Sequence, residues 1–279
     1  MSDTRTLESR IWDVKATLGD RLVILGHHYQ RDEVIQFADF RGDSLGLSQQ
    51  AASVERARYI VFCGVHFMAE TAAILARPGQ QVFSPDPSAG CFLADAASLD
   101  DVAGAWALLD EALGEAVQEV TPVTYVNSSA QLKAFCGERG GIVCTSSNAK
   151  AILEWSFRRR KKVLFFPDQH LGRWTGYKMG IPLEQMVVWD FDQELGGLTP
   201  EQIRDAKMIL WKGHCSVHQM FQPQHVERWR AAHPKGFVIS HPECASRSAR
   251  PATSSAPRRP TSIPSPRRRP TRSGWWAPS

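Results

Sequence analysis

The chain has 279 residues, of which 43% are hydrophobic and 22% charged, a composition typical of a globular protein with room for about two domains. Its formal charge of +4 is local, because residues 245–279 hold eight arginines and no acidic residue, while the remainder has 25 basic against 29 acidic side chains. No run approaches the roughly 20 apolar residues that span a bilayer, and no signal peptide is visible, so we expect a cytoplasmic protein without membrane contact.

Short apolar runs that end in polar residues recur along the chain after a predicted amphipathic helix at 7–20. The first group of runs is 21–26, 59–62 and 81–83, with helices predicted at 31–41, 44–55, 67–77 and 98–118. A second group is 122–126, 141–144 and 162–166, and a third is 207–211 and 236–240. Strands that alternate with helices in this way predict βαβ units and a parallel sheet.

The grouping of these runs predicts the domain organisation. We expect an α/β protein with three similar units, the last of which stops early. The predicted ranges are an N-terminal helix at 1–20, then units at 21–120, 121–200 and 201–244.

Residues 245–279 differ abruptly from the rest, since they consist mainly of Arg, Pro, Ser, Thr and Ala. Such a segment buries too little apolar surface to offset the entropy of ordering it, so we expect disorder. Three interpretations remain open: an aberrant end produced by a frameshift, a native disordered tail, or a basic arm that binds nucleic acid. No basic folded module lies beside the arm, and we therefore expect no nucleic-acid partner.

The residues at the predicted strand ends are mostly thiols, imidazoles, hydroxyls and amides. If the units surround a common axis, these side chains meet in one cavity, with thiolates for a soft metal and hydrogen-bond donors for an anionic substrate. The six cysteines are scattered and form no C-x2-C pair, which argues against zinc and leaves an iron–sulfur cluster open. The strand-end residues are His27, Tyr29, Cys63, His66, Cys91, Tyr125, Asn127, Ser146, Asn148, Asp168, His170, Cys215, His218, His241 and Glu243.

Eight segments of the chain match, in order, the motifs of one family. They are 26–30, 42–45, 89–91, 125–128, 145–149, 167–172, 211–218 and 241–244. Over residues 20–244 the chain therefore resembles the quinolinate synthases. The resemblance implies three similar three-layer α/β domains about a pseudo-three-fold axis and a [4Fe–4S] cluster held by one cysteine from each domain. It also implies an enzyme of NAD biosynthesis that condenses iminoaspartate with dihydroxyacetone phosphate to quinolinate, with L-aspartate oxidase as the supplier of iminoaspartate.

The resemblance also implies roles for individual residues. Cys91 and Cys215 correspond to cluster ligands, with His218 one helical turn after Cys215 as a supporting residue. Catalytic roles are implied for His27, Tyr29 and Glu243, and substrate contacts for His27, Ser44, Tyr125, Asn127, Ser146, His241 and Glu243. Taken alone, Ser44 also fits a helix N-cap position and Tyr125 a packed strand residue. Cys63, Cys136 and Cys144 are expected to be buried thiols.

The chain departs from the family after residues 241–244. The family continues with a further helix, a substrate-binding Ser-Thr-Ser turn and the third cluster cysteine, whereas residues 245–279 contain no cysteine. We therefore expect this chain to be impaired as an enzyme and to expose apolar surface at its incomplete third unit. The alternative is a catalytically inactive metal-binding α/β protein with a basic interaction tail.

Overall fold

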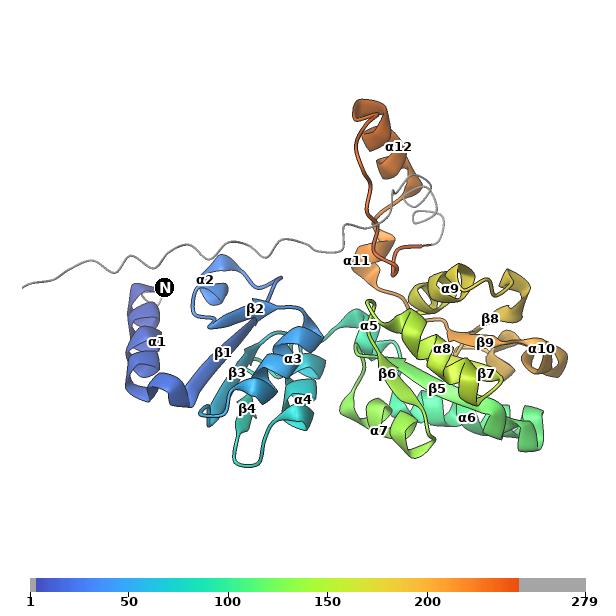
Figure 1. Ribbon diagram of the computed structural model, residues 1–279, viewed down its shortest axis with the longest axis horizontal. Coiled ribbons are helices and arrows are strands. Elements are labelled where there is room, and N and C mark those ends of the chain that lie inside the picture. The colour runs from blue at the N-terminus through green and yellow to red at the C-terminus, as the bar shows by residue number, and fades with distance from the viewer. Residues whose placement is uncertain (1–3, 246–279) are drawn as a thin grey trace, which may run out of the picture.

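The fold is α/β, with two parallel sheets that follow one another along the chain (Figure 1). The computed structural model describes residues 4–245, with side chains from residue 7 onward. The predictions made for 246–279 lie outside the described residues. Within the described part, no helix is long and apolar enough to cross a membrane.

The first sheet has four strands in the order β2-β1-β3-β4, all parallel. Its strands are β1 (Leu22–His27), β2 (Phe40–Gly42), β3 (Tyr59–Cys63) and β4 (Gln81–Phe83). Its helices are α1 (Thr4–Leu18), α2 (Asp32–Ile35), α3 (Ser44–Ser53) and α4 (His66–Leu75). Apolar residues of β1 and β3 pack against α3 and α4 on one face, and the other face is turned to α1 and α2.

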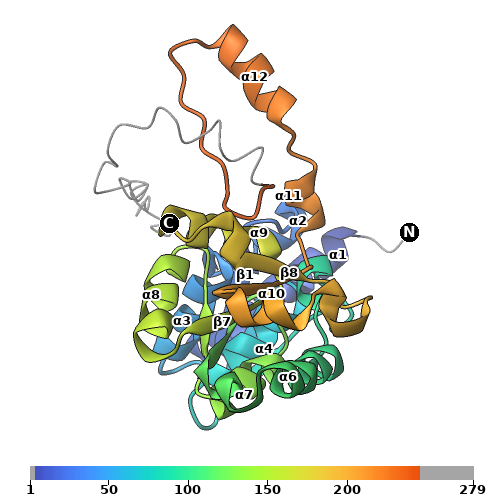
Figure 2. The same ribbon diagram turned by 90° about the vertical axis from the view of Figure 1, so that its right-hand side faces the viewer.

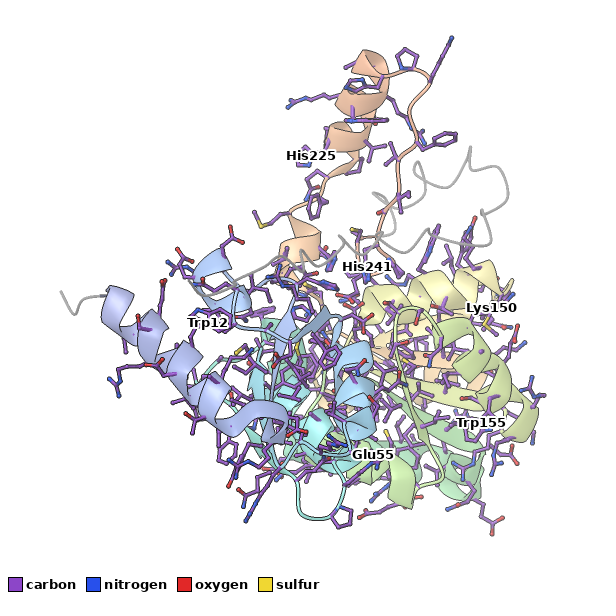
Figure 3. The ribbon with its side chains drawn as sticks, turned by 60° about the vertical axis from the view of Figure 1, so that its left-hand side comes forward. Trp12, Glu55, Lys150, Trp155, His225 and His241 are labelled. Atoms are coloured by element: carbon purple, nitrogen blue, oxygen red, sulfur yellow. The ribbon has the colours of Figure 1, made fainter. Side chains whose placement is uncertain are left out.

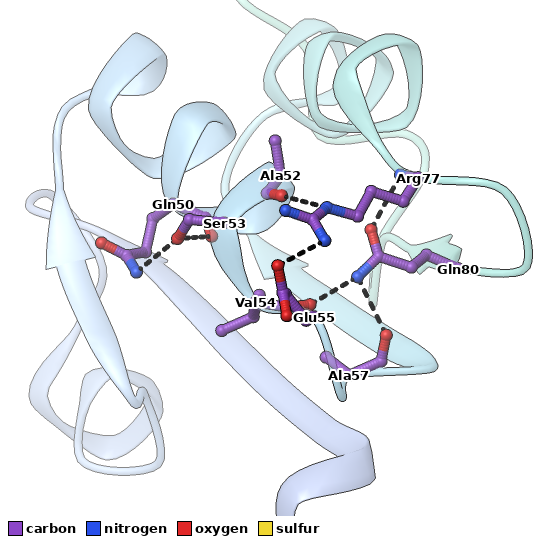
Figure 4. A network of polar contacts seen from close by, with 8 residues as sticks. All are labelled: Gln50, Ala52, Ser53, Val54, Glu55, Ala57, Arg77 and Gln80. Carbon is purple, nitrogen blue, oxygen red and sulfur yellow. Dashed lines mark hydrogen bonds and ion pairs between the residues drawn. The ribbon is translucent and has the colours of Figure 1, made fainter.

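Arg77 and Gln80 close the loop that leads into β4 (Figure 4). The Arg77 guanidinium donates to the Ala52 carbonyl at 2.9 Å and pairs with Glu55 at 2.9 Å. Gln80 donates to the carbonyls of Val54 and Ala57, at 2.7 and 2.9 Å. These bonds satisfy backbone groups that the end of α3 would otherwise leave unpaired, and so they hold α3 against the β3–β4 edge.

The second sheet has five parallel strands in the order β6-β5-β7-β9-β8. Its strands are β5 (Val120–Tyr125), β6 (Ile142–Cys144), β7 (Lys162–Phe166), β8 (Met186–Trp189) and β9 (Met208–Trp211). Its helices are α6 (Leu99–Leu113), α7 (Ala130–Glu138), α8 (Ala149–Arg159), α9 (Gln169–Lys178) and α10 (Pro200–Asp205). Short 3-10 turns lie at Gly19–Arg21, before the first sheet, and at Gly114–Glu119, Leu183–Gln185 and Glu194–Gly197 around the second. A short helix, α5 (Phe92–Asp95), lies between the two sheets in the sequence.

Both faces of the second sheet are covered by helices. Alternate residues of its strands pack with α6, α7 and α10 on one face and with α8 and α9 on the other. The three middle strands are almost wholly buried, as expected of parallel strands between two helical layers. This sheet, like the first, is therefore the middle layer of a three-layer arrangement.

Several predicted elements differ from the structure. The strand predicted at 207–211 to open a third unit is β9, which pairs with β7 and β8 inside the second sheet, so the predicted boundary at residue 200 is wrong for this sheet. Helix α6, assigned to the first unit, packs on the second sheet through Val102, Ala105 and Leu109. β2 and β8 were not predicted. β2 has only three residues and no apolar run, whereas the Met-Val-Val-Trp run of β8 is a signal that sequence reasoning passed over.

The last described segment forms an arm that stands away from the two sheets (Figures 1 and 2). It consists of α11 (Ser216–Gln219), α12 (Pro223–Ala232) and an extended return over 233–244. The strand predicted at 236–240 is not formed, because no described strand lies beside it to accept its hydrogen bonds. The pseudo-three-fold arrangement of three units is accordingly not seen among residues 4–245.

Candidate metal centre and active site

Two cysteines distant in sequence approach each other between the two sheets. Cys91 immediately precedes α5, and Cys215 immediately precedes α11. Both are half-buried and pack against the same apolar cluster of the second sheet. Phe92, which follows Cys91, and His214, which precedes Cys215, have ring centroids 5.5 Å apart. Burial raises the pKa of the Cys91 thiol, backbone amides of α5 partly offset this, and negative charge on Cys215 would raise it further.

The loop that carries Cys215 is fixed from two sides. The Trp211 indole donates to the Ala96 carbonyl at 2.7 Å, which ties the end of β9 to α5. Gly213 forms a parallel bridge with Asp168, and the Gln169 amide donates to the Gly213 carbonyl at 3.0 Å. The position of Cys215 is therefore set by the carboxyl ends of β7 and β9, the edge where open α/β sheets bind ligands.

Glu243 is the centre of a buried polar cluster at the base of the arm. The carboxylate is almost fully buried and accepts a hydrogen bond of 2.6 Å from the Tyr125 hydroxyl. Its other oxygen lies 3.1 Å from His218 Nδ1, and His241 Nδ1 lies 3.6 Å from the first. The His218 and His241 rings stack at 4.6 Å, and Gln219 donates to the Glu243 carbonyl. Figure 3 labels His241 at this base and His225 further out on the arm.

The protonation states of this cluster follow from its contacts. Close contacts with the Cys215 thiol and the Glu243 carboxylate raise the pKa of His218 to about 10. Burial acts to raise the pKa of Glu243, but the nearby His218, the hydrogen bond from Tyr125 and the His241 imidazole outweigh it, so this pKa lies below its usual value. Burial and the Glu243 charge raise the pKa of Tyr125 well above its usual value. Near neutral pH the cluster therefore holds an imidazolium, a carboxylate and a neutral phenol.

Cys215, His218 and Glu243 together form a compact set of metal ligand atoms. The sulfur, one imidazole nitrogen and one carboxylate oxygen all lie within 4.8 Å of one another. His218 and Glu243 come from opposite ends of the arm, 25 positions apart in the sequence. The arm thus folds back on its own base and places two donors beside the thiol.

The residues predicted from the first sheet form a separate group in this structure. His27 is buried at the end of β1, and the centroids of its ring and the exposed Tyr29 ring are 4.6 Å apart in an edge-to-face arrangement. Burial lowers the pKa of His27, and the His28 charge adds to this. Ser44 is the first residue of α3, whose N-cap is Asp43. Among residues 4–245, the ring contacts of His27 are with His28 and Tyr29, and the contacts of Glu243 are with Tyr125, His218 and His241, so none of these joins the two groups.

The two other predicted substrate-contact residues lie at the ends of β5 and β6. The Ser146 side chain lies near the Tyr125 hydroxyl, where it acts to lower the pKa of this phenol. Asn127 is half-buried two residues after the end of β5, and within the described part its side chain forms no hydrogen bond. The structure thus brings together Tyr125, His241 and Glu243, with Ser146 near Tyr125, and no contact among the described residues ties Asn127 to them.

Asp168 and His170 were predicted to lie at a strand end, with no role assigned to them. Asp168 is fully buried, and Oδ1 accepts the Leu171 amide at 2.7 Å, which caps α9. Its Oδ2 is buried without a partner among the described residues, and burial raises its pKa to about 7. Burial lowers the pKa of His170 to about 4, and its Nδ1 is also buried and unpaired in this part of the chain.

Comparison with known proteins identifies the family. The family model described as quinolinate synthetase A protein matches residues 9–256. A quinolinate synthase of Herpetosiphon aurantiacus is 56% identical over 239 residues, covering 85% of this chain and 64% of the relative. The enzyme of Rhodopirellula baltica is 55% identical over 253 residues, covering 87% and 64%, and that of Corynebacterium glutamicum 54% over 237 residues, covering 85% and 60%.

The chain belongs to the quinolinate synthetase A family. It spans somewhat less than two thirds of the length of these relatives. The α/β fold predicted from the sequence and the predicted family are both confirmed.

The donor chemistry suits an iron–sulfur cluster as far as the described residues reach. Cys91, at the N-cap of α5, and Cys215, in the loop between β9 and α11, are half-buried free thiols from separate parts of the chain. Thiolates are the usual ligands of such clusters, and the surrounding apolar side chains would shield one from water. These two cysteines of the quinolinate synthetase A chain therefore fit the group as two of its ligands.

Proposed function

We propose that this chain carries the cluster-binding and much of the substrate-binding edge of a cytoplasmic quinolinate synthase. The reaction condenses iminoaspartate with dihydroxyacetone phosphate to quinolinate, with loss of phosphate and water, and L-aspartate oxidase is the proposed source of iminoaspartate. One observation carries the proposal. Cys91 and Cys215 approach each other directly beside the buried Tyr125–Glu243–His218 cluster.

A [4Fe–4S] cluster would be held here by Cys91 and Cys215, with a further thiolate from the part of the family that lies beyond the matched residues. When bound, an open iron would supply a Lewis acid that polarises a hydroxyl group leaving as water. The leaving hydroxyl group would then lie near Glu243 and Tyr125. The Glu243 carboxylate can accept a proton, and the Tyr125 phenol can donate one.

The residues of the Glu243 cluster are suited to moving a proton. Glu243 is ionised, so it can accept a proton from a bound substrate, and Tyr125 stays a neutral phenol that donates a hydrogen bond of 2.6 Å to this carboxylate and can donate a proton to substrate. His218 compensates the carboxylate charge at 3.1 Å. We assign the carboxylate and polar-group contacts of the substrate to Ser44, Tyr125, Asn127, Ser146 and His241.

On the first sheet, His27 and Tyr29 are proposed to bind the triose and transfer its protons. The lowered pKa of His27 keeps its imidazole neutral near neutral pH, so either ring nitrogen can exchange a proton with a bound hydroxyl group. Tyr29 is 84% exposed, and its edge-on contact with the His27 ring leaves the hydroxyl free to meet a ligand.

The proposed function is tested by quinolinate formation in a chimera. Residues 1–244 are joined to the segment that follows the same His-Pro-Glu-Cys motif in the Herpetosiphon aurantiacus relative, and the protein is reconstituted anaerobically with iron and sulfide. We expect quinolinate from iminoaspartate and dihydroxyacetone phosphate, and a loss of at least 100-fold with Glu243→Gln, in keeping with the usual contribution of a general acid or base. Full activity of the Glu243→Gln chimera would contradict the role of Glu243, and an inactive chimera that holds four irons would contradict the proposed function.

A second function is favoured by the Cys215–His218–Glu243 set, whose sulfur, nitrogen and oxygen donors lie within 4.8 Å. Such a set also suits Zn²⁺, in a metal-binding α/β protein without catalytic activity. His218 would have to lose its proton to bind the ion, so zinc uptake by this set would release protons. Metal analysis after anaerobic purification separates the two functions, since zinc without acid-labile sulfide supports the second and iron with sulfide supports the first.

A further inference from the structure

A basic cavity lies at the edge of the second sheet opposite to the candidate active site. It has a volume of about 760 Å³ and lies where β5, β7 and β9 begin, whereas Tyr125 ends β5 and Cys215 follows the end of β9. Seven cationic side chains line it, against the two acids Glu119 and Asp205. The cations are residues 158–162, Arg204 and Lys207.

Some of these cations have structural partners. The Arg160 guanidinium donates to the carbonyls of Val120 and Arg139, both at 2.8 Å. The Lys162 ammonium donates to carbonyls at the end of α10, among them that of Ala206 at 2.6 Å. These two side chains satisfy carbonyl groups at the ends of secondary-structure elements. If Arg160 or Lys162 bound a ligand instead, these carbonyl groups would lose their hydrogen bonds and the protein would lose stability.

Of the other cations of the cavity, Arg204 pairs with Glu201 and Arg159 lies over the Trp155 ring, which leaves Arg158, Lys161 and Lys207. Arg158 and Lys207 are exposed, and within residues 4–245 neither side chain forms a hydrogen bond or an ion pair. Lys161 is 3.8 Å from Glu119, a distance at which an exposed pair contributes little.

Helix dipoles account for only part of this charge. Cations at the last turn of α8 and α10 interact favourably with the helix ends, which explains Arg158 and Arg204 in part. Lys207 lies after α10, whose final carbonyls are already occupied by Lys162. The excess positive charge therefore repels itself across the cavity, and an anion bound between Arg158 and Lys207 would relieve that repulsion.

One wall of the same cavity is apolar. Phe157, Met179 and Ile181 line it, and Phe157 and Met179 are only half-buried in the sheet's core. An aromatic ring and a thioether offer a surface on which a flat ring can pack. A ligand with both a flat ring and phosphate groups could therefore contact this wall and the cations at the same time. Inorganic phosphate alone would leave this wall uncovered.

We propose that this cavity binds a small nucleoside polyphosphate, with the phosphates at Arg158, Lys161 and Lys207 and the base against Phe157 and Met179. The site is separate from the proposed catalytic edge and does not depend on the cluster. Its volume is within the range of about 300–1,000 Å³ that small-ligand sites occupy.

Isothermal titration of the purified chain with ATP, inorganic tripolyphosphate and adenosine tests this proposal. We expect ATP to bind, tripolyphosphate to bind several-fold more weakly, and adenosine not to bind measurably. The double variant Arg158→Glu/Lys207→Glu should lower the affinity for ATP at least tenfold, because each charge-assisted hydrogen bond contributes about 1.5–3 kcal/mol and 1.4 kcal/mol is one factor of ten. The milder Arg158→Gln/Lys207→Gln should lower it in the same direction.

The matched control is Arg228→Glu, which reverses an exposed cation on α12 that does not line the cavity. It should change the affinity less than twofold. Equal losses in Arg228→Glu and in the double variant would show non-specific attraction and overturn the proposal, as would the absence of ATP binding. Equal affinity for ATP and tripolyphosphate would overturn the role of the apolar wall, and tighter binding of a single-stranded oligonucleotide than of ATP would overturn the small-molecule assignment.

Discussion

Tyr125 and Glu243 form the contact that fastens the arm to the second sheet. Both are buried, they are 118 positions apart in the sequence, and the hydroxyl donates to the carboxylate at 2.6 Å. Removing one partner from such a pair leaves the other buried without its hydrogen bond, which costs more than the bond contributes. The pair is therefore structural as well as chemically suited to proton transfer.

Tyr125→Phe should lower the free energy of unfolding by about 1–3 kcal/mol, since the Glu243 carboxylate loses a buried donor. Tyr59→Phe is the control, because the Tyr59 ring contacts Phe83 and its hydroxyl forms no hydrogen bond within the described residues, and it should change stability by less than about 0.5 kcal/mol. Urea denaturation measures both. In a double-mutant cycle with Glu243→Gln the coupling energy should exceed about 0.5 kcal/mol, and additive effects would contradict a direct interaction.

Asp168 should make the stability of the protein depend on pH. Burial raises its pKa to about 7 from an ordinary 3.8, so between these values the unfolded chain has released a proton that the folded chain keeps. The contribution of Asp168 to stability therefore falls as the pH rises from about 4 to about 7 and is constant above that. Asp168→Asn cannot ionise, and it retains an acceptor for the Leu171 amide.

Relative to the wild type, Asp168→Asn should become more stable by roughly 2–4 kcal/mol as the pH rises from about 4 to about 7. The difference between the two unfolding curves is the readout, because the other titrating groups cancel in it. A difference that stays flat with pH would contradict the buried, protonated state of Asp168.

For single residues, the sequence predicts which side chains belong to the candidate site more reliably than it predicts which of them contact one another. The motifs place Cys91, Cys215, Tyr125 and Glu243 at strand ends, and the structure brings all four to the region between the sheets and the arm. His218 was predicted to support Cys215, but its contact with Glu243 was not predicted, because it requires the arm to fold back on itself. Orphaned atoms such as Asp168 Oδ2 depend on packing around them, which no local pattern reveals.

At the element scale, the loop from β9 to Cys215 depends on a close approach at Gly213. A Cβ atom there would lie 2.3 Å from the Pro167 carbonyl oxygen and 3.1 Å from the Ala96 Cβ. The backbones of the β7 and β9 loops and α5 are therefore in contact where only glycine fits.

Gly213→Ala should lower the free energy of unfolding by about 1–3 kcal/mol, as overpacking does in a rigid site. Gly104→Ala is the control, since Gly104 lies inside α6 with nothing within 4 Å of an added Cβ, and it should raise stability by up to about 1 kcal/mol. Thermal unfolding checks both. If Gly213→Ala is as stable as the wild type, the loop is not held as tightly as its contacts indicate.

The alternation of strands and helices gave the α/β class correctly, and most buried strands were placed because their apolar runs are continuous. The assignment of strands to sheets was less successful. Nothing local distinguishes β9, which enters the second sheet between β7 and β8, from a strand that opens a new sheet. A pairing choice of this kind is made by non-local contacts, such as the packing of Ile209 and Trp211 with α6 and α10.

At the scale of the whole molecule, the arm presents apolar side chains that the rest of the described chain does not cover. Ile239 is 95% exposed, Phe237 67% and Phe221 53%. They border a cavity of about 540 Å³ between α12 and the return segment. The expectation of exposed apolar surface in this part of the chain is thus confirmed within residues 4–245.

This surface should bind the dye ANS. Phe237→Ser/Ile239→Ser should reduce ANS fluorescence by about half or more, because contiguous apolar surface of this kind is what such dyes occupy. Ile74→Ser removes a single exposed apolar side chain, 57% exposed, from the body of the protein and should leave the signal nearly unchanged. Equal reductions in the two variants would show that the dye does not report on the arm.

The proposed metal centre requires Cys91 and Cys215 to bind one cluster together, and its most direct test is the iron and acid-labile sulfide bound after anaerobic reconstitution of the chimera proposed above. Cys91→Ser and Cys215→Ser should each reduce both to near background. Cys63→Ser is the matched control, because Cys63 is also half-buried at a strand end but lies in the first sheet, and it should retain the full content. If Cys63→Ser loses as much iron as Cys91→Ser, or if Cys91→Ser and Cys215→Ser both keep theirs, the proposed centre is contradicted.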